Sequence, residues 1–426
     1  MNRIIGFILI IFILCTMLSG CYDSRDVDDL TYVIAVGLDK GKLEPLRLTL
    51  QYAVPKEMGG GGGGGGGEGG GSKAISTVTV ECSSLSSGIN LVNGFVSKQI
   101  NVSHAIVAVF SEELAKEGIS KFLYGMERGR EFRPNMYVAV SRGSAEHYLS
   151  QVQPIQEVDP TKYYQLIFSS YKYTGFAPNS KLFSLLNKFK NTMGQPVVAL
   201  AGVSKHKSLD DFAKDPDFAK KPPTTEQNFL PGNIIKQGDI AGEIMGLAVF
   251  DGDKFMGEMT GEESTDYLMV TGDYSNSYLT MPDPKKPDNY IILNVKQSRY
   301  PVSKVKLMGN TPQINVEIKL EADFIAIQSG FNYENPQNLG LVENAASSLI
   351  KDRVTRFLNR TSKEFQCDIC SFGKEAVKKF LTTKQWNDYN WFGKYKNANF
   401  NVKVEMRIRR PGLMIRTVPI NTSQGG

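Results

Sequence analysis

The first 21 residues constrain this chain more than any other segment, because they have the form of an export signal that ends at a lipid-modified cysteine. Arg3 is followed by an almost unbroken apolar run over residues 4–17, and small residues then lead into Cys21. Cleavage before Cys21 would leave that cysteine, carrying a diacylglycerol group, as the N-terminus. Residues 1–20 are therefore predicted to be a lipoprotein signal peptide. The apolar run is shorter than the roughly 20 residues of a membrane-spanning helix, so we expect a lipid-anchored chain that faces outward.

A retained N-terminal anchor with an incidental cysteine is the alternative interpretation, and the order Leu-Ser-Gly-Cys over residues 18–21 disfavours it. One acyl chain binds a bilayer only marginally, whereas two chains hold a protein there stably. About nine residues separate Cys21 from the first expected strand, residues 31–38. Such a segment spans at most about 30 Å when fully extended. We therefore expect the folded part to lie close to the bilayer surface.

The chain has 426 residues, of which 41% are hydrophobic and 22% are charged, as in ordinary globular proteins. This length exceeds one typical hydrophobic core, so two or three domains are expected. Cys15 lies in the signal and Cys21 is assigned to the lipid. The remaining cysteines, Cys82, Cys367 and Cys370, are too few for a disulfide scaffold in an exported protein of this size.

Charge is distributed unevenly, although the net value is only +5. Residues 371–416 contain eleven basic and three acidic residues, a balance of +8, whereas residues 23–29 carry four aspartates around Arg25. The basic segment fits a solvated surface, contact with anionic lipid headgroups or contact with an acidic partner. If the chain docks through one region, we expect this one. Nucleic acid is not an expected partner, since the chain is exported and has no aromatic-basic motif.

The one low-complexity segment contains nine glycines, Glu68 and three further glycines over residues 59–71. A glycine run has no side chains to bury and loses the most backbone entropy on ordering, so residues 58–72 are predicted to be a disordered loop. The flanking residues 46–54 and 75–81 alternate in the manner of strands, which makes the loop a hairpin connection. A phosphate-binding loop is disfavoured, because no G-K-[ST] ending and no helix follow.

The chain is predicted to form two mixed modules, residues 21–204 and 240–416, joined by a polar, proline-containing linker over residues 205–239 and followed by a frayed tail over residues 417–426. Strands of the first module are expected over residues 31–38, 46–54, 75–81, 105–110, 136–140 and 196–203, and helices over residues 85–98, from residue 111 and over residues 182–189.

The second module is predicted to start near Ile240 with a hairpin, whose strands over residues 244–250 and 254–259 flank the turn Asp251-Gly252-Asp253. Its longest helix, residues 338–365, has an apolar stripe on one side. Its other elements are expected strands over residues 290–297, 314–327 and 399–409 and a helix over residues 375–381. The fold class is α+β, multidomain, with mixed, mainly antiparallel sheets and packed helices.

The motifs of catalysis and metal binding are missing from the sequence. His104, His147 and His206 have no paired metal spacing, and no G-x-S-x-G elbow occurs. Cys367 and Cys370 would need two more ligands to hold zinc, so a local disulfide or two free thiols are expected. His104 is expected to be a structural hydrogen bonder. We therefore expect no enzyme, no catalytic residue, no cofactor and no bound metal.

Four blocks of residues, which run in order along nearly the whole mature chain, resemble the C-subunit lipoproteins of spore germinant receptors. Tyr22 stands where that family usually has tryptophan, the glycine run is peculiar to this chain, and the family motif does not require Cys367 or Cys370. The blocks are residues 20–30 with 36–39; Ser103, His104, residues 112–119, Arg128, Glu131 and Arg133; residues 246–250 with Asp253, Lys254 and Gly257; and Asp368, Ile369, Phe372, Gly373, Trp386 and residues 402–412.

The resemblance implies a non-enzymatic subunit of a nutrient germinant receptor, needed for receptor assembly and for triggering germination. It implies a site on the outer face of the spore inner membrane, integral-membrane A and B subunits as partners, and contact with the phospholipid bilayer through the Cys21 lipid. It also implies three α+β domains, one more than the modules delimited above. No small-molecule substrate is expected, because germinant specificity would lie in a partner.

Two other function classes remain open at this point. A solute-binding lipoprotein of an importer would have two similar lobes and an aromatic-lined cleft, and would show a ligand-dependent shift in thermal stability. An outward-facing hydrolase would need a nucleophile and a base, and its turnover would be abolished by one serine or carboxylate substitution.

Overall fold

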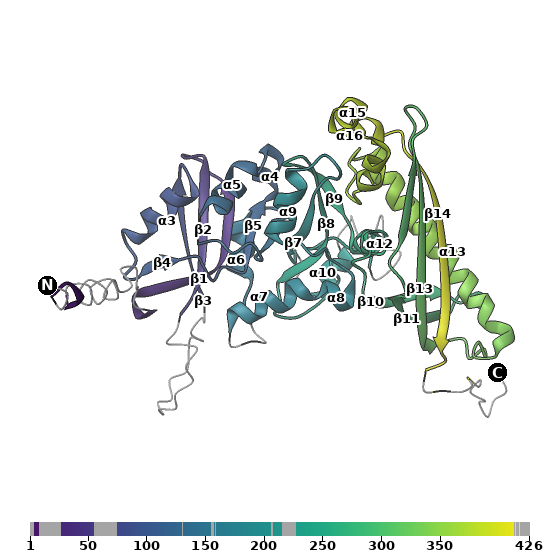
Figure 1. Ribbon diagram of the computed structural model, residues 1–426. Coiled ribbons are helices and arrows are strands. Elements are labelled where there is room, and N and C mark those ends of the chain that lie inside the picture. The colour runs from purple at the N-terminus through teal and green to yellow at the C-terminus, as the bar shows by residue number, and fades with distance from the viewer. Residues whose placement is uncertain are drawn as a thin grey trace, which may run out of the picture.

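The computed structural model describes residues 4–7, 27–54, 75–129, 131–154, 157, 159–205, 208–214, 227–412, 414 and 417. These residues form two sheets, each with helices packed on it, in an elongated molecule with one sheet toward each end (Figure 1). Cys21, the glycine-rich loop, His206 and most of the predicted tail lie outside the described residues. No helix within these ranges combines the length and apolar character of a membrane span.

The N-terminal sheet has the strand order β3-β2-β1-β5-β6-β7-β8-β9, with β4 beside β1. Strands β1, β5, β6 and β7 are parallel to one another, and antiparallel pairs extend the sheet at both ends. The strands are β1 (Leu30–Lys40), β2 (Leu46–Ala53), β3 (Ile75–Cys82), β4 (Gln99–Asn101), β5 (Val107–Ser111), β6 (Tyr137–Ser141), β7 (Val197–Val203), β8 (Gly242–Asp251) and β9 (Lys254–Met259).

Helices cover both faces of this sheet, as parallel strands require, and two apolar clusters result. One face packs against α3 (Leu85–Asn93), α4 (Glu112–Glu117), α5 (Ser120–Arg128) and α9 (Leu182–Phe189). The other face packs against α6 (Ala145–Gln151) and α7 (Pro160–Ser169). The remaining short helices are η1 (Val27–Asp29), α8 (Tyr171–Thr174) and α10 (Leu209–Lys214).

The C-terminal sheet has the order β10-β11-β13-β12, and β14 runs parallel to β13 on its other side. Buried and solvent-facing residues alternate along β13, which identifies one face as core. The strands are β10 (Asn276–Pro282), β11 (Tyr290–Gln297), β12 (Val302–Lys306), β13 (Gln313–Ile327) and β14 (Asn399–Arg410). The helices are α12 (Gly261–Thr271), α13 (Pro336–Lys363), α14 (Gly373–Ala376), η2 (Val377–Lys379), α15 (Thr383–Tyr389) and α16 (Trp391–Tyr395).

The long helix α13 lies along β14 and protects part of its edge (Figure 1). The Met406 N–H donates to Ser347 Oγ at 3.0 Å, and the Ile408 N–H donates to Glu343 Oε1 at 2.9 Å. Edge strands with free N–H groups invite pairing with other chains. Two side chains of α13 thus accept hydrogen bonds from backbone N–H groups of β14 that would otherwise have no partner in the sheet.

Strand β8 lies in the N-terminal sheet and contributes side chains to both hydrophobic cores. The hairpin of β8 and β9, which was expected to open the C-terminal module, continues the N-terminal sheet, because β8 pairs antiparallel with β7. The boundary between the modules stays a prediction. Ala248 and Phe250 face the N-terminal core, while Leu247 and Val249 belong to the C-terminal core. One strand therefore contributes to both cores.

The described part of the expected linker is held against both units. Gln227 Nε2 donates to the carbonyl of Tyr278 in β10 at 2.6 Å, and Arg142 Nη1 donates to the carbonyl of Pro231 at 2.8 Å. Helix α10 also lies in this segment. Residues 227–234 are buried or partly buried, whereas residue 235 and residues 237–240 are exposed, and the linker assignment stays a prediction.

We predict that the protein unfolds in one calorimetric transition, because β8 belongs to both cores. Leu247→Ala removes a side chain from the C-terminal core and Phe250→Ala one from the N-terminal core. Each should lower the free energy of unfolding by about 2–5 kcal/mol. Differential scanning calorimetry of the three proteins measures this. Two resolved transitions, with each variant shifting only one of them, would contradict a shared strand.

Candidate functional site

A polar cavity of about 590 Å³ opens where β1 and β5 end, beside the starts of α4 and α6. Its charged residues have both signs, and most are already paired: Lys40 with Glu117 at 2.6 Å and Lys116 with Glu112 at 2.5 Å. The residues that line it are Asp39, Lys40, Gly41, Lys42, Arg47, Ser111, Glu112, Glu113, Lys116, Gly143 and Ser144. The cavity therefore has no strong preference for an anion or a cation.

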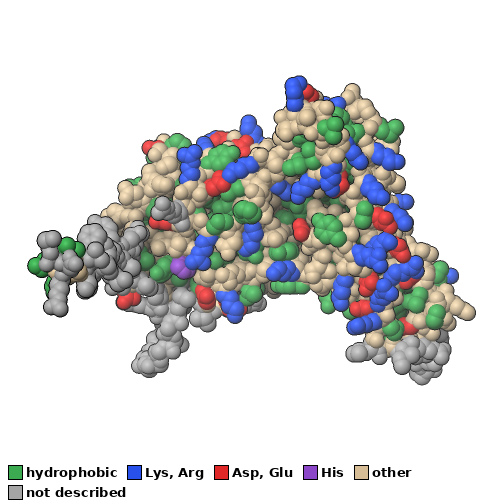
Figure 2. Space-filling model, viewed as in Figure 1, with side chains coloured by type: hydrophobic (Ala, Val, Ile, Leu, Met, Phe, Trp, Pro, Cys, Tyr) green, Lys and Arg blue, Asp and Glu red, His purple; other side chains and the backbone are tan. Residues whose placement is uncertain are grey.

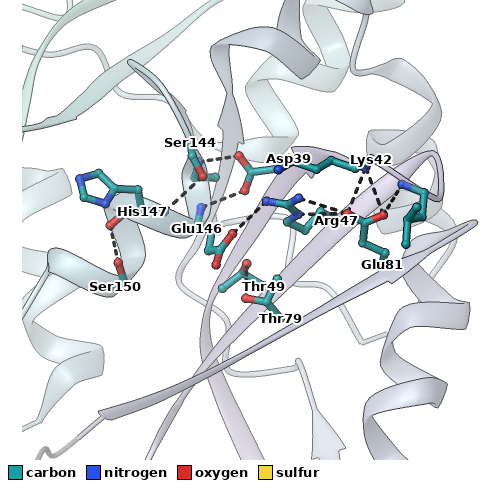
Figure 3. Close-up of polar contacts among 12 residues, drawn as sticks. Asp39, Lys42, Arg47, Thr49, Thr79, Glu81, Ser144, Glu146, His147 and Ser150 are labelled. Atoms are coloured by element: carbon teal, nitrogen blue, oxygen red, sulfur yellow. Dashed lines mark hydrogen bonds and ion pairs between the residues drawn. The ribbon is translucent and has the colours of Figure 1, made fainter.

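Asp39, the last residue of the first family-like block, binds the first backbone N–H groups of helix α6. Its two carboxylate oxygens accept hydrogen bonds from the backbone N–H groups of Ala145 (2.8 Å) and Glu146 (2.9 Å) (Figure 3). The first N–H groups of a helix have no partner within the helix, and a negative charge there is favourable. Asp39 is 5% exposed. Its role is to connect β1 to α6.

Glu81 at the end of β3 fixes the neighbouring β1–β2 turn. Its carboxylate accepts from the N–H groups of Lys42, Leu43 and Glu44, and it pairs with Arg47 at 3.2 Å (Figure 3). The backbone N–H of Lys42 and the other donors lower the pKa of Glu81 to about 2. Arg47 also reaches Glu146 at 3.3 Å, so strand, turn and helix are joined by one charged group.

His147 does not form a catalytic pair with the serines beside it. Its backbone N–H donates to Ser144 Oγ at 3.2 Å, and its carbonyl accepts from Ser150 Oγ at 2.8 Å. The imidazole points away from the other residues drawn (Figure 3). These contacts begin and continue helix α6.

His104 makes structural contacts. Its ring lies edge-on to Tyr32 at 4.6 Å between centroids, and its Nδ1 is 3.1 Å from Ser103 Oγ. Burial lowers the pKa of His104, with a further contribution from the nearby Arg133. A neutral imidazole thus holds the loop before β5 against β1.

Asp253, in the third family-like block, holds the turn between α4 and α5. Its Oδ2 accepts from Ser120 Oγ at 2.5 Å, and its carbonyl accepts from the Ile119 N–H at 3.1 Å. Gly118 has φ of 118°, and a Cβ there would lie 2.7 Å from Asp253 Oδ2. The glycine is required both by its backbone angle and by this close approach.

Gly246, in the same block, allows β8 to pass close to its neighbours. Its φ is 85°, and a Cβ would lie 2.2 Å from the carbonyl oxygen of Met259. Its N–H donates to the carbonyl of Phe176 at 2.6 Å. A side chain at this position would displace the joint between the two units.

Asp368, in the fourth block, organises the contact between the C-terminal helices and the N-terminal unit. Its carboxylate accepts from the N–H groups of Phe372 (3.0 Å) and Gly373 (2.8 Å) and from Trp391 Nε1 (2.8 Å). Its carbonyl accepts from the Gln195 N–H at 2.8 Å. Burial raises the pKa of Asp368 to about 6, although the hydrogen bonds lower it.

Cys367 and Cys370 are free thiols on either side of Asp368. Cys367 Sγ donates to the Phe365 carbonyl at 3.1 Å, and burial raises its pKa to about 12. A thiol with a raised pKa is a poor nucleophile and a poor metal ligand. Across the part of the chain that is described, no group of three His, Cys, Asp or Glu residues is placed to hold a metal ion.

Ion pairs between α12 and α13 line a second cavity, of about 730 Å³, at the junction of the units. Arg353 Nη2 lies 3.1 Å from Asp266 Oδ1, and Arg360 Nη1 lies 2.7 Å from Glu263 Oε1. Burial raises the pKa of Asp266 to about 7, whereas Arg353 lowers it. Sequence reasoning missed these residues, because α12 is buried on most sides and has no amphipathic stripe.

Basic side chains gather over the C-terminal unit on the face that Figure 2 shows, with fewer acidic ones between them. Arg409 pairs with Glu321 at 2.7 Å, and Lys378 pairs with Glu375 at 2.6 Å. Exposed pairs of this kind add only about 0–1 kcal/mol each. Lys384, Lys403 and Arg407 also have acidic partners, so part of the positive charge over residues 371–416 is balanced by ion pairs at the surface.

Comparison with known proteins identifies the family. The family described as "Spore germination protein N-terminal domain" matches residues 23–203, and that described as "Spore germination B3/ GerAC like, C-terminal" matches residues 245–412. The chain belongs to the GerAC-like family of spore germination proteins. This confirms the predicted family. The three-domain division that the resemblance implies stays a prediction.

Relatives align over nearly the full chain. Spore germination protein KC of Bacillus subtilis (strain 168) is 24% identical over 404 residues, which are 93% of each chain. Putative spore germination protein YfkR of the same organism is 22% identical over 408 residues, 95% of this chain and 96% of that protein. The crystal structure of the GerBC protein matches 88% of this chain and 96% of its own with a TM-score of 0.51 at 13% identity. The structural likeness supports the α+β fold.

We predict that Asp39→Ala destabilises the protein by about 1–3 kcal/mol, because the buried N–H of Ala145 and the N–H of Glu146 lose their acceptor. Urea unfolding followed by circular dichroism measures this. Lys40→Ala, at the neighbouring half-exposed position, is the matched control and should have little effect. Equal stability of Asp39→Ala and wild type would show that the cap is not needed.

We predict that Asp266 makes stability depend on pH. Its pKa of about 7 in the fold exceeds its ordinary value of 3.8. Between these values the folded chain holds a proton that the unfolded chain has lost, so the free energy of unfolding falls as pH rises. Urea titrations at pH 5 and pH 8 should show a smaller decrease in the free energy of unfolding for Asp266→Asn than for wild type. Asp352→Asn, on the exposed side of α13, should keep the wild-type slope, and an unchanged slope in Asp266→Asn would contradict the assignment.

Proposed function

We propose that this chain is the lipid-anchored, non-enzymatic C subunit of a spore nutrient germinant receptor, needed for receptor assembly and for triggering germination. Family membership over both units supports a role in spore germination. The observation that carries the rest of the proposal is the use of the family-like residues inside the fold. Asp39, Gly246, Asp253 and Asp368 all cap, pack or join elements. Residues with these structural roles maintain the shape of a surface that can contact other proteins.

The proposed partners are the integral-membrane A and B subunits of the receptor and the phospholipid bilayer, reached through the lipid on Cys21. The proposed location is the outer face of the spore inner membrane. The sequence of the first 21 residues supports the anchor, since the lipobox order ends at Cys21. Germinant specificity would reside in a membrane-spanning partner.

The architecture does not favour the importer alternative. A solute-binding lipoprotein needs two similar lobes around a cleft, whereas the two sheets here differ in strand order and in the share of parallel pairs. The two cavities described above are lined mainly by charged residues that pair with one another, in contrast to the apolar lining of typical ligand pockets. We therefore propose action through contact surfaces.

We predict that spores lacking this chain release dipicolinate poorly in response to nutrients, and that wild type restores release. Cys21→Ala should restore it poorly, because a chain without acyl groups leaves the membrane. Cys15→Ala, in the same leader but before the cleavage site, is the matched control and should restore release fully.

Immunoblots of membrane fractions should show loss of the Cys21→Ala protein and retention of the Cys15→Ala protein. Full release with Cys21→Ala would contradict the lipid anchor. Normal release in a deletion strain that has no related receptor would contradict the role in nutrient germination.

A further inference from the structure

Two exposed apolar side chains lie four residues apart at the C-terminal end of α3. Leu91, on the last turn of α3, is 50% exposed, and Phe95, four residues later, is 60% exposed. Residues four apart share a helix face, and the turn continues past the helix because the Phe95 N–H donates to the Val92 carbonyl at 3.1 Å. Lys98 follows on the exposed connection to β4. We call Leu91, Phe95 and Lys98 the α3–β4 surface.

Strand pairing places this surface next to the start of the folded chain. Leu30, the first residue of β1, pairs in parallel with Gln99, the first residue of β4. Phe95 precedes Gln99 by four residues, and Leu30 follows Cys21 by nine. A fully extended chain adds at most about 3.6 Å per residue, so both the surface and Cys21 stay within a few tens of ångströms of Leu30. Figure 1 shows α3 and β4 at the N-terminal extreme, with the C-terminal sheet at the far end.

We propose that the α3–β4 surface inserts into the headgroup region of the same bilayer that holds the Cys21 lipid. The inference rests on the proposed function, since the lipid anchor supplies the proximity. Aromatic and aliphatic side chains partition into the bilayer interface, and a lysine beside them keeps its ammonium among the phosphates. Two attachment points, a lipid and a side-chain wedge, orient a domain where one tether would let it turn freely.

If the α3–β4 surface inserts, the long axis of the molecule stands away from the membrane plane. With α3 and β4 against the lipid, the long axis carries the C-terminal sheet away from the bilayer (Figure 1). The ion-paired basic surface around Arg409 then faces solvent or the outer parts of partner subunits. Lipid headgroups would contact the N-terminal unit, at the end of the molecule away from Arg409.

Fluorescence quenching by brominated lipids tests this proposal on the full acylated protein reconstituted into phosphatidylglycerol–phosphatidylethanolamine vesicles. Phe95→Trp places an indole on the α3–β4 surface. The native Trp386 and Trp391 are 4% and 2% exposed in the C-terminal unit, so they give a constant background. Leu381→Trp, at a 94% exposed position of the C-terminal unit, is the matched control.

Brominated acyl chains should remove about half or more of the added emission of Phe95→Trp and leave that of Leu381→Trp unchanged. Equal quenching of the two variants would overturn the proposal. An unquenched Phe95→Trp would also overturn it. If Phe95→Asp then fails to copurify with the membrane subunits, the α3–β4 surface is a protein contact. Mass spectrometry of the N-terminal peptide keeps the tests separate: an unmodified Cys21 refutes the anchor itself, whereas a modified Cys21 without quenching refutes only the wedge.

Discussion

Strand β8 is packed on both faces, and each face belongs to a different hydrophobic core. Ala248 and Phe250 complete the N-terminal core, while Leu247 and Val249 enter the C-terminal one. The strand reaches this position because Gly246 tolerates a positive φ beside the Met259 carbonyl. The ion pairs between α12 and α13 and the hydrogen bonds of Asp368 lie on the same junction. The two units therefore share their stability.

The family-like residues lie both at this junction and within the N-terminal unit. Asp39 and Asp253 hold helices of the N-terminal unit, and Asp368 fastens the C-terminal helices to it. These polar residues thus serve the shape of the fold. Family membership supports a role in spore germination.

The sequence predicted local elements well where one face is apolar and the other polar. Residues 182–189, 254–259 and 290–297 have the bounds that their periodicity indicated. The helix expected over residues 85–98 ends at Asn93 because Gly94 follows. Helix α12 was missed because its polar residues are buried as partners of Arg353. The pairing of β8 with β7 was missed because periodicity does not reveal which strand is the neighbour.

Native-state hydrogen exchange at β8 tests the central claim most directly. If one strand serves both cores, the amides of Leu247, Ala248 and Val249 exchange only through global unfolding. Their protection should then equal that of the central strands β5 and β13 at every denaturant concentration. Faster exchange of β13 than of β8, with a separate dependence on denaturant, would show that the C-terminal unit opens by itself, and it would contradict shared stability of the two units.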